Sequence, residues 1–177
     1  MSESELIAGC QKAEGKAQKM LYEQYASKMY AVCLRYLKNE MDAEDALLNG
    51  FMKVFQNIDR FEAKGSFEGW IRRIVVNEAL AFLRKKEPLY MGIEDNLIQV
   101  ACNSSADQHL AEGELMALLH TLPAGYRAVF NLYAIEGYSH KEIADMLNIN
   151  VGTSKSQLSK ARAMLQRRLE GQNAIAV

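Results

Sequence analysis

The residues best equipped to bind another molecule lie between Ser139 and Leu165. Helical spacing puts cations and hydrogen-bonding side chains on the open side of the second half of this segment: Lys155, Gln157, Ser159, Lys160 and Arg162. From 152 to 170 there are five Lys or Arg residues and one acidic residue. Such a local excess of positive charge is what contact with nucleic-acid phosphates requires. The chemistry that these residues indicate is therefore non-covalent binding of a polyanion.

The order of helix signals in the same segment predicts a helix-turn-helix. Ser139 and Glu142 have the spacing of a capping box, in which each side chain accepts a hydrogen bond from the other residue's backbone N–H. Apolar residues within 143–147 predict a short helix, and Asn148 to Asn150 interrupt it because Asn tolerates turn conformations. The second helix, from 151, would bury its apolar side: Leu158, Ala161, Met164 and Leu165. This layout is typical of proteins that place the second helix in the DNA major groove. The alternative interpretation is two helices of an ordinary helical core, which can show the same spacing of apolar residues.

A second set of candidate residues combines aromatic rings with cations between residues 59 and 86. The segment 59–70 reads as a loop that contains Phe61, Phe67 and Trp70, and an amphipathic helix follows it. The outer side of that helix carries Arg72, Arg73 and Asn77. Rings that stack on unpaired bases beside cations that follow phosphates are what single-stranded nucleic acid needs, and such a loop could also hold a flipped base. Ordinary core packing is the alternative interpretation for Phe67 and Trp70.

A third set lies on the helical pattern from 42 to 58. Its buried stripe comprises Leu47, Phe51, Val54, Phe55 and Ile58, while Asp42, Asp45 and Asn49 share the opposite face. Carboxylates in a first helical turn are favourable with the helix dipole, and that is the structural interpretation. The functional alternative is an acidic docking face for a basic partner. The sequence has no His at the helical metal-site spacing, no nucleophile–base pair and no phosphate loop, so we predict neither an enzyme nor a metal or other cofactor.

Composition and periodicity predict an all-α protein with two small helical domains. The chain has 177 residues, of which 49% are hydrophobic and only two are proline. Helix-period stretches dominate the domains predicted over 14–86 and 114–170. The segment 87–113 between them contains Pro, Gly and an Asn-Ser-Ser run, several acidic residues and no Lys or Arg. We predict a flexible acidic linker there.

Charge and cysteine content indicate how the protein would bind a polyanion and in which cellular compartment it acts. The formal net charge is −1, so binding to a polyanion has to come from local patches. The three cysteines are widely spaced, without a CxxC pair, which is typical of reduced thiols rather than of disulfides or a zinc site. No apolar run has the length of a signal peptide or of a membrane span. We therefore expect a cytoplasmic protein that does not insert into membranes.

Taken together, these segments resemble the extracytoplasmic-function (ECF) sigma factors, the small group of the sigma-70 family of RNA polymerase subunits. The resemblance covers about 17–169. DAEDALLNGFMKVF resembles the part of sigma region 2 that docks on the β′ clamp helices of RNA polymerase, and GSFEGWIRRIVVNEALAFLRK resembles the part that melts and reads the −10 element. LPAGYRAVFNLYAIEGYSHKEIADMLNINVGTSKSQLSKARAML resembles sigma region 4, whose recognition helix reads the −35 element.

The resemblance implies binding to core RNA polymerase, through the β′ clamp helices and the β flap, and to promoter DNA during transcription initiation. The polymerase-docking residues that it implies are Asp42, Asp45, Asn49 and Phe51. Those implied for −10 DNA are Phe61, Lys64, Phe67, Trp70, Arg72, Arg73 and Asn77. Those implied for −35 DNA are Thr153, Lys155, Gln157, Ser159, Lys160 and Arg162. This chain has Leu48-Asn49 where family members often have Gln followed by an acid, so its docking face is less acidic. Many members are held inactive by an anti-sigma protein, which is a further candidate partner.

Two other functions fit parts of the sequence. A helix-turn-helix regulator that acts without polymerase would need a dimerisation or ligand domain at the N-terminus, and the acidic helix with its loop and basic helix fits neither. A sigma-like decoy that binds only an anti-sigma protein would not need Lys155, Lys160 or Arg162. Both alternatives are therefore less favoured than a sigma factor.

Overall fold

The computed structural model describes residues 2–87 and 112–175, and in these ranges the only regular elements are helices. The prediction of an all-α fold is confirmed. The chain divides into two compact units, one up to Phe82 and one from Leu83 onward. The predicted linker, 87–113, falls largely on 88–111, which lies outside the described residues; Glu112 and Gly113 already belong to a helix. None of the helices described combines the length and apolar character that crossing a bilayer requires.

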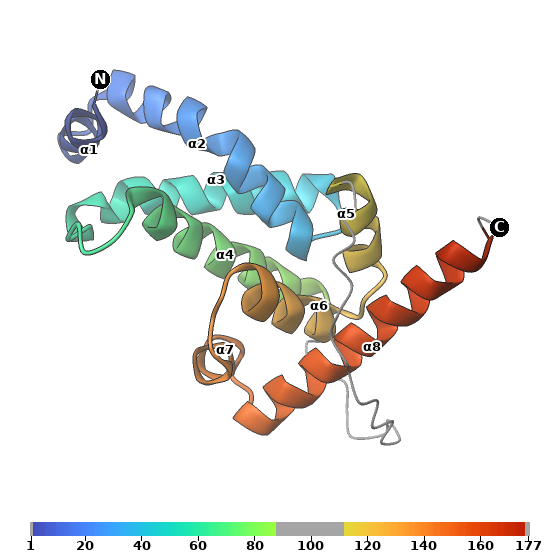
Figure 1. The fold of residues 1–177 in the computed structure, drawn as a ribbon. Helices are drawn as coiled ribbons and strands as arrows, with labels where there is room; N and C mark the ends of the chain where they lie inside the picture. The colour runs from blue at the N-terminus through green and yellow to red at the C-terminus, as the bar shows by residue number, and fades with distance from the viewer. Residues whose placement is uncertain (1, 88–111, 176–177) are drawn as a thin grey trace. The chain divides into compact units, whose positions relative to one another are not determined.

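The first unit is a bundle of helices (Figure 1). Each of its α-helices buries apolar side chains on one side. Its elements are α1 (Glu3–Gln11), α2 (Gly15–Tyr36), α3 (Glu40–Asn57), the short 3₁₀ helix η1 (Ile58–Arg60) and the part of α4 (Phe67–Lys86) up to Phe82. In α2, fully or nearly fully buried side chains recur every four residues at Leu21, Tyr25, Met29 and Cys33. This spacing keeps them on one side of the helix, against which α1 and α3 pack.

Helix α1 extends the first unit beyond the domain predicted to begin at residue 14. Ser2 and Glu5 form a capping box, with Ser2 N donating to Glu5 Oε2 at 2.7 Å and Glu5 N donating to Ser2 Oγ at 3.3 Å. Leu6 and Cys10 are each only 2% exposed. Gly9 permits the close contact with α2, because a Cβ there would lie 2.6 Å from Ala17 Cβ. The spacing of Ser2 and Glu5 is the sequence signal that could have predicted α1.

The second unit contains the predicted helix-turn-helix and the helices that support it. Its complete elements are α5 (Glu112–His120), α6 (Ala124–Phe130), η2 (Asn131–Ile135), α7 (His140–Leu147) and α8 (Val151–Ile175). A core of Leu118, Leu119, Leu122, Tyr126, Ala161 and Leu165 packs α5 and α6 against α8. The apolar spacing over 124–135 is that of a single continuous helix, but its second part, η2, is a π-helix, in which Glu136 N donates to Asn131 O at 2.9 Å. The wider π turn was missed because apolar periodicity does not distinguish it from an α turn.

We predict that Cys33 is inert to alkylation in the native protein. Its side chain is fully buried, and this burial raises the pKa of the thiol to about 12. Because the thiolate is the reactive form, iodoacetamide at pH 8 should modify Cys33 only after unfolding in guanidinium. Peptide mass spectrometry of native and unfolded samples measures this. Native labelling at the rate of a free thiol would contradict the burial.

Candidate nucleic-acid interface

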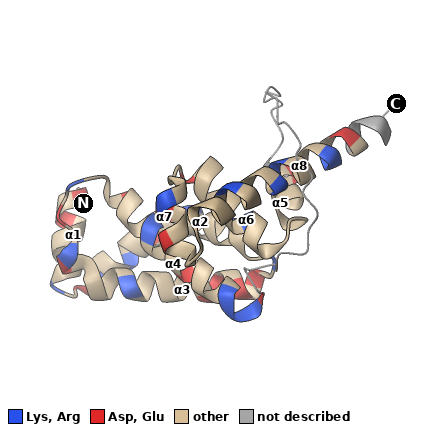
Figure 2. Ribbon diagram, turned by 90° about the horizontal axis from the view of Figure 1, so that it is seen from below, with Lys and Arg blue, Asp and Glu red and all other residues tan. Residues whose placement is uncertain are grey.

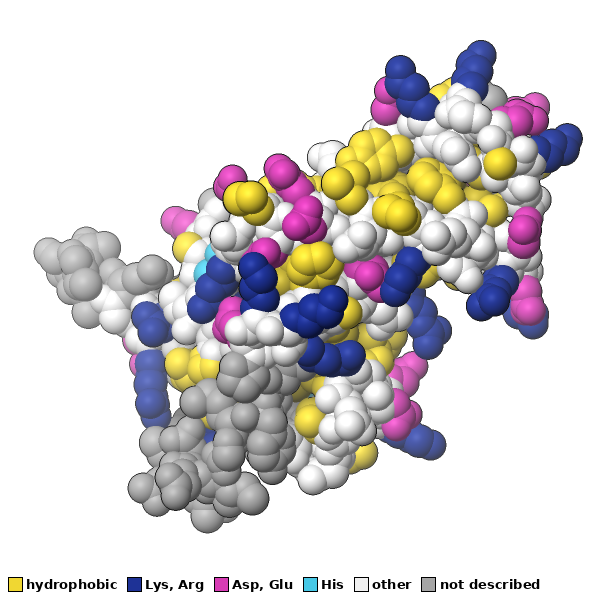
Figure 3. Space-filling view, turned by 180° about the vertical axis from the view of Figure 1, so that it is seen from behind, with side chains coloured by type: hydrophobic (Ala, Val, Ile, Leu, Met, Phe, Trp, Pro, Cys, Tyr) yellow, Lys and Arg dark blue, Asp and Glu magenta, His cyan; other side chains and the backbone are white. Residues whose placement is uncertain are grey.

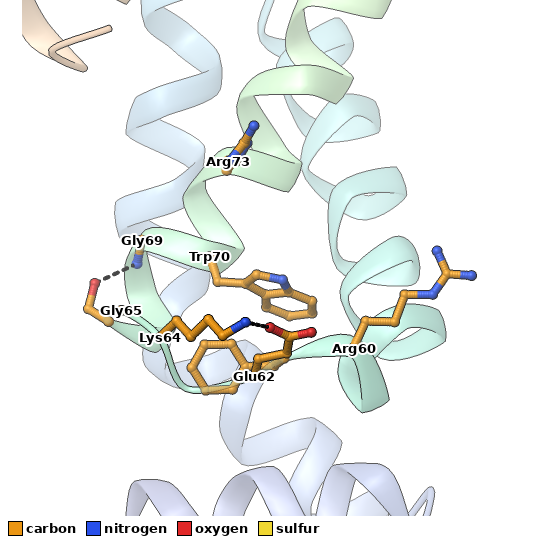
Figure 4. Close-up of a pocket in the computed structure, with 9 residues that line it drawn as sticks. Arg60, Glu62, Lys64, Gly65, Gly69, Trp70 and Arg73 are labelled. Carbon is orange, nitrogen blue, oxygen red and sulfur yellow. Dashed lines mark hydrogen bonds and ion pairs between the residues drawn. The ribbon is translucent and has the colours of Figure 1, made fainter.

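The loop between η1 and α4 lines an open pocket of about 400 Å³. Its lining residues are Arg60, Phe61, Glu62, Lys64, Gly65, Ser66, Gly69, Trp70 and Arg73. Figure 4 shows Lys64, Glu62 and Trp70 gathered at the pocket, with Arg60 projecting from η1 and Arg73 from α4. The pocket therefore brings together four of the residues predicted for −10 DNA: Phe61, Lys64, Trp70 and Arg73.

A buried aromatic residue holds this loop to the first unit. Phe67 is 1% exposed, and its ring lies 6.0 Å from that of Tyr25 on α2. The Phe67 ring also packs against the Phe61 ring in a tilted arrangement, with centroids 5.0 Å apart, and stacks on the Trp70 ring, with centroids 5.8 Å apart. Phe61 and Trp70 remain partly exposed. The core-packing interpretation is therefore correct for Phe67, which supports the two rings that face the pocket and is not itself available to a base.

Local backbone interactions shape the loop and begin α4. Ala63 has a left-handed backbone with φ of 52° and lies in the bend between Phe61 and α4. Ser66 Oγ accepts a hydrogen bond from Gly69 N at 3.1 Å, so Ser66 satisfies one of the free N–H groups in the first turn of α4. This places Trp70 and Arg73 on successive turns of one face of the helix, and Asn77, which is exposed, continues that face.

The charges around the pocket can respond to a ligand. Lys64 forms an ion pair with Glu62, and both side chains are largely exposed. Exposed pairs contribute little to stability, so an entering group could separate them at small cost. Arg72 is half-buried and does not line the pocket, unlike Arg73. Arg60 and Glu62 were not predicted; their position directly beside Phe61 was the available signal.

Helix α3 presents an outer face that is both apolar and acidic. Asn39 begins the helix by accepting hydrogen bonds from Met41 N at 2.8 Å and Asp42 N at 3.2 Å. Asp45 and Asn49 are exposed, as predicted, and Asp42 is partly so. Large apolar side chains share that face: Met41, Leu48 and Met52 are 74%, 52% and 57% exposed. Figure 3 shows hydrophobic side chains grouped on one face of the molecule with acidic side chains beside them.

Phe51, which the resemblance places on the polymerase-docking helix, is buried, as its position in the predicted apolar stripe indicated. Phe51 is 2% exposed and packs edge-on against Tyr22 at 4.8 Å, so it belongs to the core and cannot meet a partner directly. Met41 and Met52 take its place on the surface, at the spacing 41, 45, 48, 52 that aligns one stripe of a helix. The surface position of Met41 and Met52 could have been predicted from the sequence, because both lie outside the buried stripe of the helix.

The turn of the helix-turn-helix forms as the sequence predicted. Ser139 N donates to Glu142 Oε2 at 2.8 Å and Glu142 N to Ser139 Oγ at 3.3 Å, which is the predicted capping box. Asn148 ends α7 in the left-handed conformation with φ of 54°. Asn150 Oδ1 then accepts from Thr153 N at 2.7 Å and begins α8. Asn therefore serves both as the residue that ends one helix and as the cap that begins the next.

The open side of α8 carries most, but not all, of the residues predicted for it. Lys155, Ser159 and Arg162 are exposed, and Thr153 and Lys160 are partly exposed. Figure 2 shows Lys and Arg recurring along this helix. Gln157 is only 6% exposed, so its predicted position on the open side is wrong. Its spacing from Ala161 and Leu165 places it on the buried side, which is wider than the apolar residues alone indicate because Ser154 also belongs to it.

An aromatic and basic cluster that the sequence did not predict joins η2, α7 and α8. The ring of Tyr133 stacks on His140 with centroids 4.6 Å apart, and Arg162 Cζ lies 5.6 Å from the Tyr133 ring centroid. His140 Nδ1 and Ser154 Oγ share a hydrogen bond of 2.9 Å. Burial, with smaller contributions from Lys155 and Arg162, lowers the pKa of His140 below its ordinary value. The imidazole is therefore neutral at neutral pH.

Two family models match the chain. The model for sigma-70 region 2 matches residues 21–88, and the model for sigma-70 region 4 matches residues 112–165. The ECF RNA polymerase sigma factor SigW of Bacillus subtilis is 32% identical over an alignment of 160 residues that covers 82% of this chain and 84% of that protein. The ECF RNA polymerase sigma factor SigE of Mycolicibacterium smegmatis is 30% identical over 152 residues, covering 82% of this chain. The match spans only 59% of that longer protein.

A solved sigma factor structure has a similar fold. The sigma factor RpoE of Bartonella quintana, solved in complex with the anti-sigma factor NepR, superposes with a TM-score of 0.55 at 25% identity. The superposition covers 86% of this chain and 96% of that one.

Among the residues described here, no cluster of three or more His, Cys, Asp or Glu side chains could hold a metal ion.

We predict that His140 makes the second unit less stable in acid. Its folded pKa is lowered, so between that pKa and the ordinary value of about 6.5 the unfolded chain binds more protons. The free energy of unfolding should therefore fall as the pH drops from about 7.5 to about 5.5, and His140→Gln should reduce this loss. Urea denaturation of both proteins across the pH range measures the difference. Parallel pH profiles would show that the His140 environment does not matter.

Proposed function

We propose that this chain, which belongs to the ECF group of the sigma-70 family of RNA polymerase sigma factors, directs core RNA polymerase to promoters and helps to open them. The matches to the sigma-70 region 2 and region 4 models and to SigW confirm the family that the motifs predicted. The observation that carries the proposal is that one chain holds both a pocket lined by aromatic and basic residues and a helix-turn-helix whose second helix carries exposed cations. We assign the pocket to an unpaired base and the helix-turn-helix to duplex DNA. The chain acts in the cytoplasm as a polymerase subunit and has no catalytic activity of its own.

The pocket at the start of α4 is proposed to take a base from the melted −10 element. Trp70 and Phe61 offer ring faces for stacking, and Lys64, Arg60 and Arg73 offer positive charge to the flanking phosphates. Glu62 adds a hydrogen-bond acceptor, freed when its exposed pair with Lys64 separates. Asn77 extends the DNA-contacting face along α4, whereas Arg72 lies to its side.

The outer face of α3 is proposed to dock on the β′ clamp helices of core polymerase. Leu48 and Met52 supply apolar area whose exposure to water is unfavourable in the free chain, and Asp45 and Asn49 supply polar contacts beside it. Because Leu48 replaces a polar residue of the family pattern, docking here depends more on apolar burial and less on charge. The second unit would meet the β flap.

Helix α8 is proposed to lie in the major groove of the −35 element. Lys155 and Ser159 are exposed near its N-terminal end, where recognition helices contact base edges. Thr153 and Lys160 are partly exposed, and we assign them to phosphates. Lys donates as a point charge and lacks the bidentate fork that Arg offers to guanine. Gln157 is not part of this surface because it is buried.

An anti-sigma protein is a further proposed partner. The support is the solved RpoE of Bartonella quintana, which is bound to the anti-sigma factor NepR. The exposed apolar stripe of α3 is a surface that such a protein could cover and so keep from polymerase.

The assay that tests the proposal is transcription by purified core RNA polymerase with and without this chain, together with size-exclusion chromatography of the mixture. Co-elution with core and new discrete start sites support it, and alignment of those starts gives the promoter. Specific duplex binding without binding to core would favour a plain helix-turn-helix regulator. Co-elution without initiation would favour a decoy.

On a promoter found in this way, Trp70→Ala should slow open-complex formation by roughly tenfold to a hundredfold, since stacking on one base contributes about 1–3 kcal/mol. Trp70→Phe should keep much of the rate because the ring remains. Permanganate reactivity of the −10 thymines measures opening. Opening at the wild-type rate by Trp70→Ala would remove the pocket from the mechanism.

In the same holoenzyme, Leu48→Asp and Met52→Asp should each weaken binding to core by roughly tenfold or more, because a charge replaces a side chain buried at the interface. Ser27→Asp, which adds the same charge at an exposed position of α2, is the matched control and should bind like wild type. Titration of labelled chain with core measures the affinities. Equal affinities for all variants would place the docking surface elsewhere.

A further inference from the structure

We propose that Tyr133 and His140 are positioning residues that hold Arg162 against a backbone phosphate of the duplex bound by α8. The inference rests on the proposed function, since it requires that α8 lies on duplex DNA. It assigns a DNA-binding role to Tyr133, a residue that precedes the helix-turn-helix in the chain.

The contact between Arg162 and Tyr133 has the geometry of a cation–aromatic interaction. The guanidinium carbon lies 5.6 Å from the ring centroid, inside the limit of about 6 Å for such contacts. Arg162 is exposed, and no carboxylate in the part of the chain that the structure describes forms an ion pair with it. Support by a ring restricts the long side chain and leaves its N–H groups free for an anion.

The ring that supports Arg162 is itself fixed from two directions. Tyr133 projects from the π-helix η2, and its exposed fraction of 36% is high for a large aromatic side chain. π-Helical turns are rare and are often found at functional sites. His140 stacks on the ring at 4.6 Å, and its hydrogen bond to the fully buried Ser154 ties the stack to α8, the helix that carries Arg162.

The position of Arg162 along α8 indicates a phosphate rather than a base as the ligand. The helix begins at Val151, so Arg162 stands about three turns in, beyond the N-terminal residues that recognition helices use for base edges. A side chain that far along a recognition helix is expected to meet the sugar–phosphate backbone rather than a base edge. A planar guanidinium is well matched to two phosphate oxygens.

The test uses the full chain and a mixed-sequence duplex of about 30 base pairs, whose affinity is measured by fluorescence anisotropy from about 25 to about 150 mM KCl. Arg162→Ala should reduce the slope of log K against log salt by about 0.9, the loss of one phosphate contact. Tyr133→Leu removes no charge, yet it should weaken binding roughly two- to fivefold and reduce the slope by part of that amount. Tyr133→Phe, which keeps the ring, should restore both.

Coupling separates positioning from a general structural effect. In the Arg162→Ala background, Tyr133→Leu should have no further effect on affinity or slope. Arg168, an exposed cation further along α8, is the matched control, and the effects of Arg168→Ala and Tyr133→Leu should simply add. If Tyr133→Leu lowers the helical circular-dichroism signal, Arg162→Lys replaces it: the charge stays, the planar group is lost, and affinity should fall as predicted for Tyr133→Leu.

The outcomes distinguish the inference from the proposed function. Additive effects of Tyr133→Leu and Arg162→Ala, or an unchanged slope in Arg162→Ala, would overturn the inference while start-site selection with core polymerase stands. No salt-dependent binding by the wild-type chain would overturn the inference and the duplex-binding part of the proposed function together.

Discussion

Burial of Phe67 beneath its aromatic neighbours is the interaction on which the pocket of the first unit depends. Its ring contacts Tyr25 from α2, Phe61 from the loop and Trp70 from α4, so three separate segments meet at one side chain. Aromatic pairs at these separations are favourable beyond the area they bury. Because Phe67 is in the core, Phe61 and Trp70 can stay half-exposed in a fixed orientation. A binding surface of this kind needs a buried anchor, since an unsupported loop would lose its order in water.

The same relation between a buried support and an exposed contact recurs in the second unit. Leu158, Ala161 and Leu165 anchor α8, and this leaves Lys155 and Ser159 facing outward. The capped turn between α7 and α8 sets the angle at which that face is presented. The capped helix ends, together with the packing of α7 against α8, therefore determine the geometry of the proposed duplex-binding surface.

The outer face of α3 differs, because it is apolar without being buried. The exposed side chains of Leu48 and Met52 do not stabilise the free chain. Their burial becomes a favourable contribution only when a partner covers them. This is the kind of surface that the proposed docking on core polymerase requires, since association would bury it. The family to which the chain belongs is consistent with such a surface.

The sequence by itself determined the all-α class, the helix-turn-helix with its capping box and Asn turn, and the segments in which the candidate sites lie. These features are local: apolar periodicity and caps act within a few residues, so they can be read along the chain. The tertiary structure decided which side chains reach the surface. Phe67 and Gln157 are buried, and Met41 and Met52 are exposed, because neighbouring helices determine how wide each buried stripe is. Tyr133, His140 and Arg162 meet only after η2, α7 and α8 pack, and no spacing in the sequence encodes that contact.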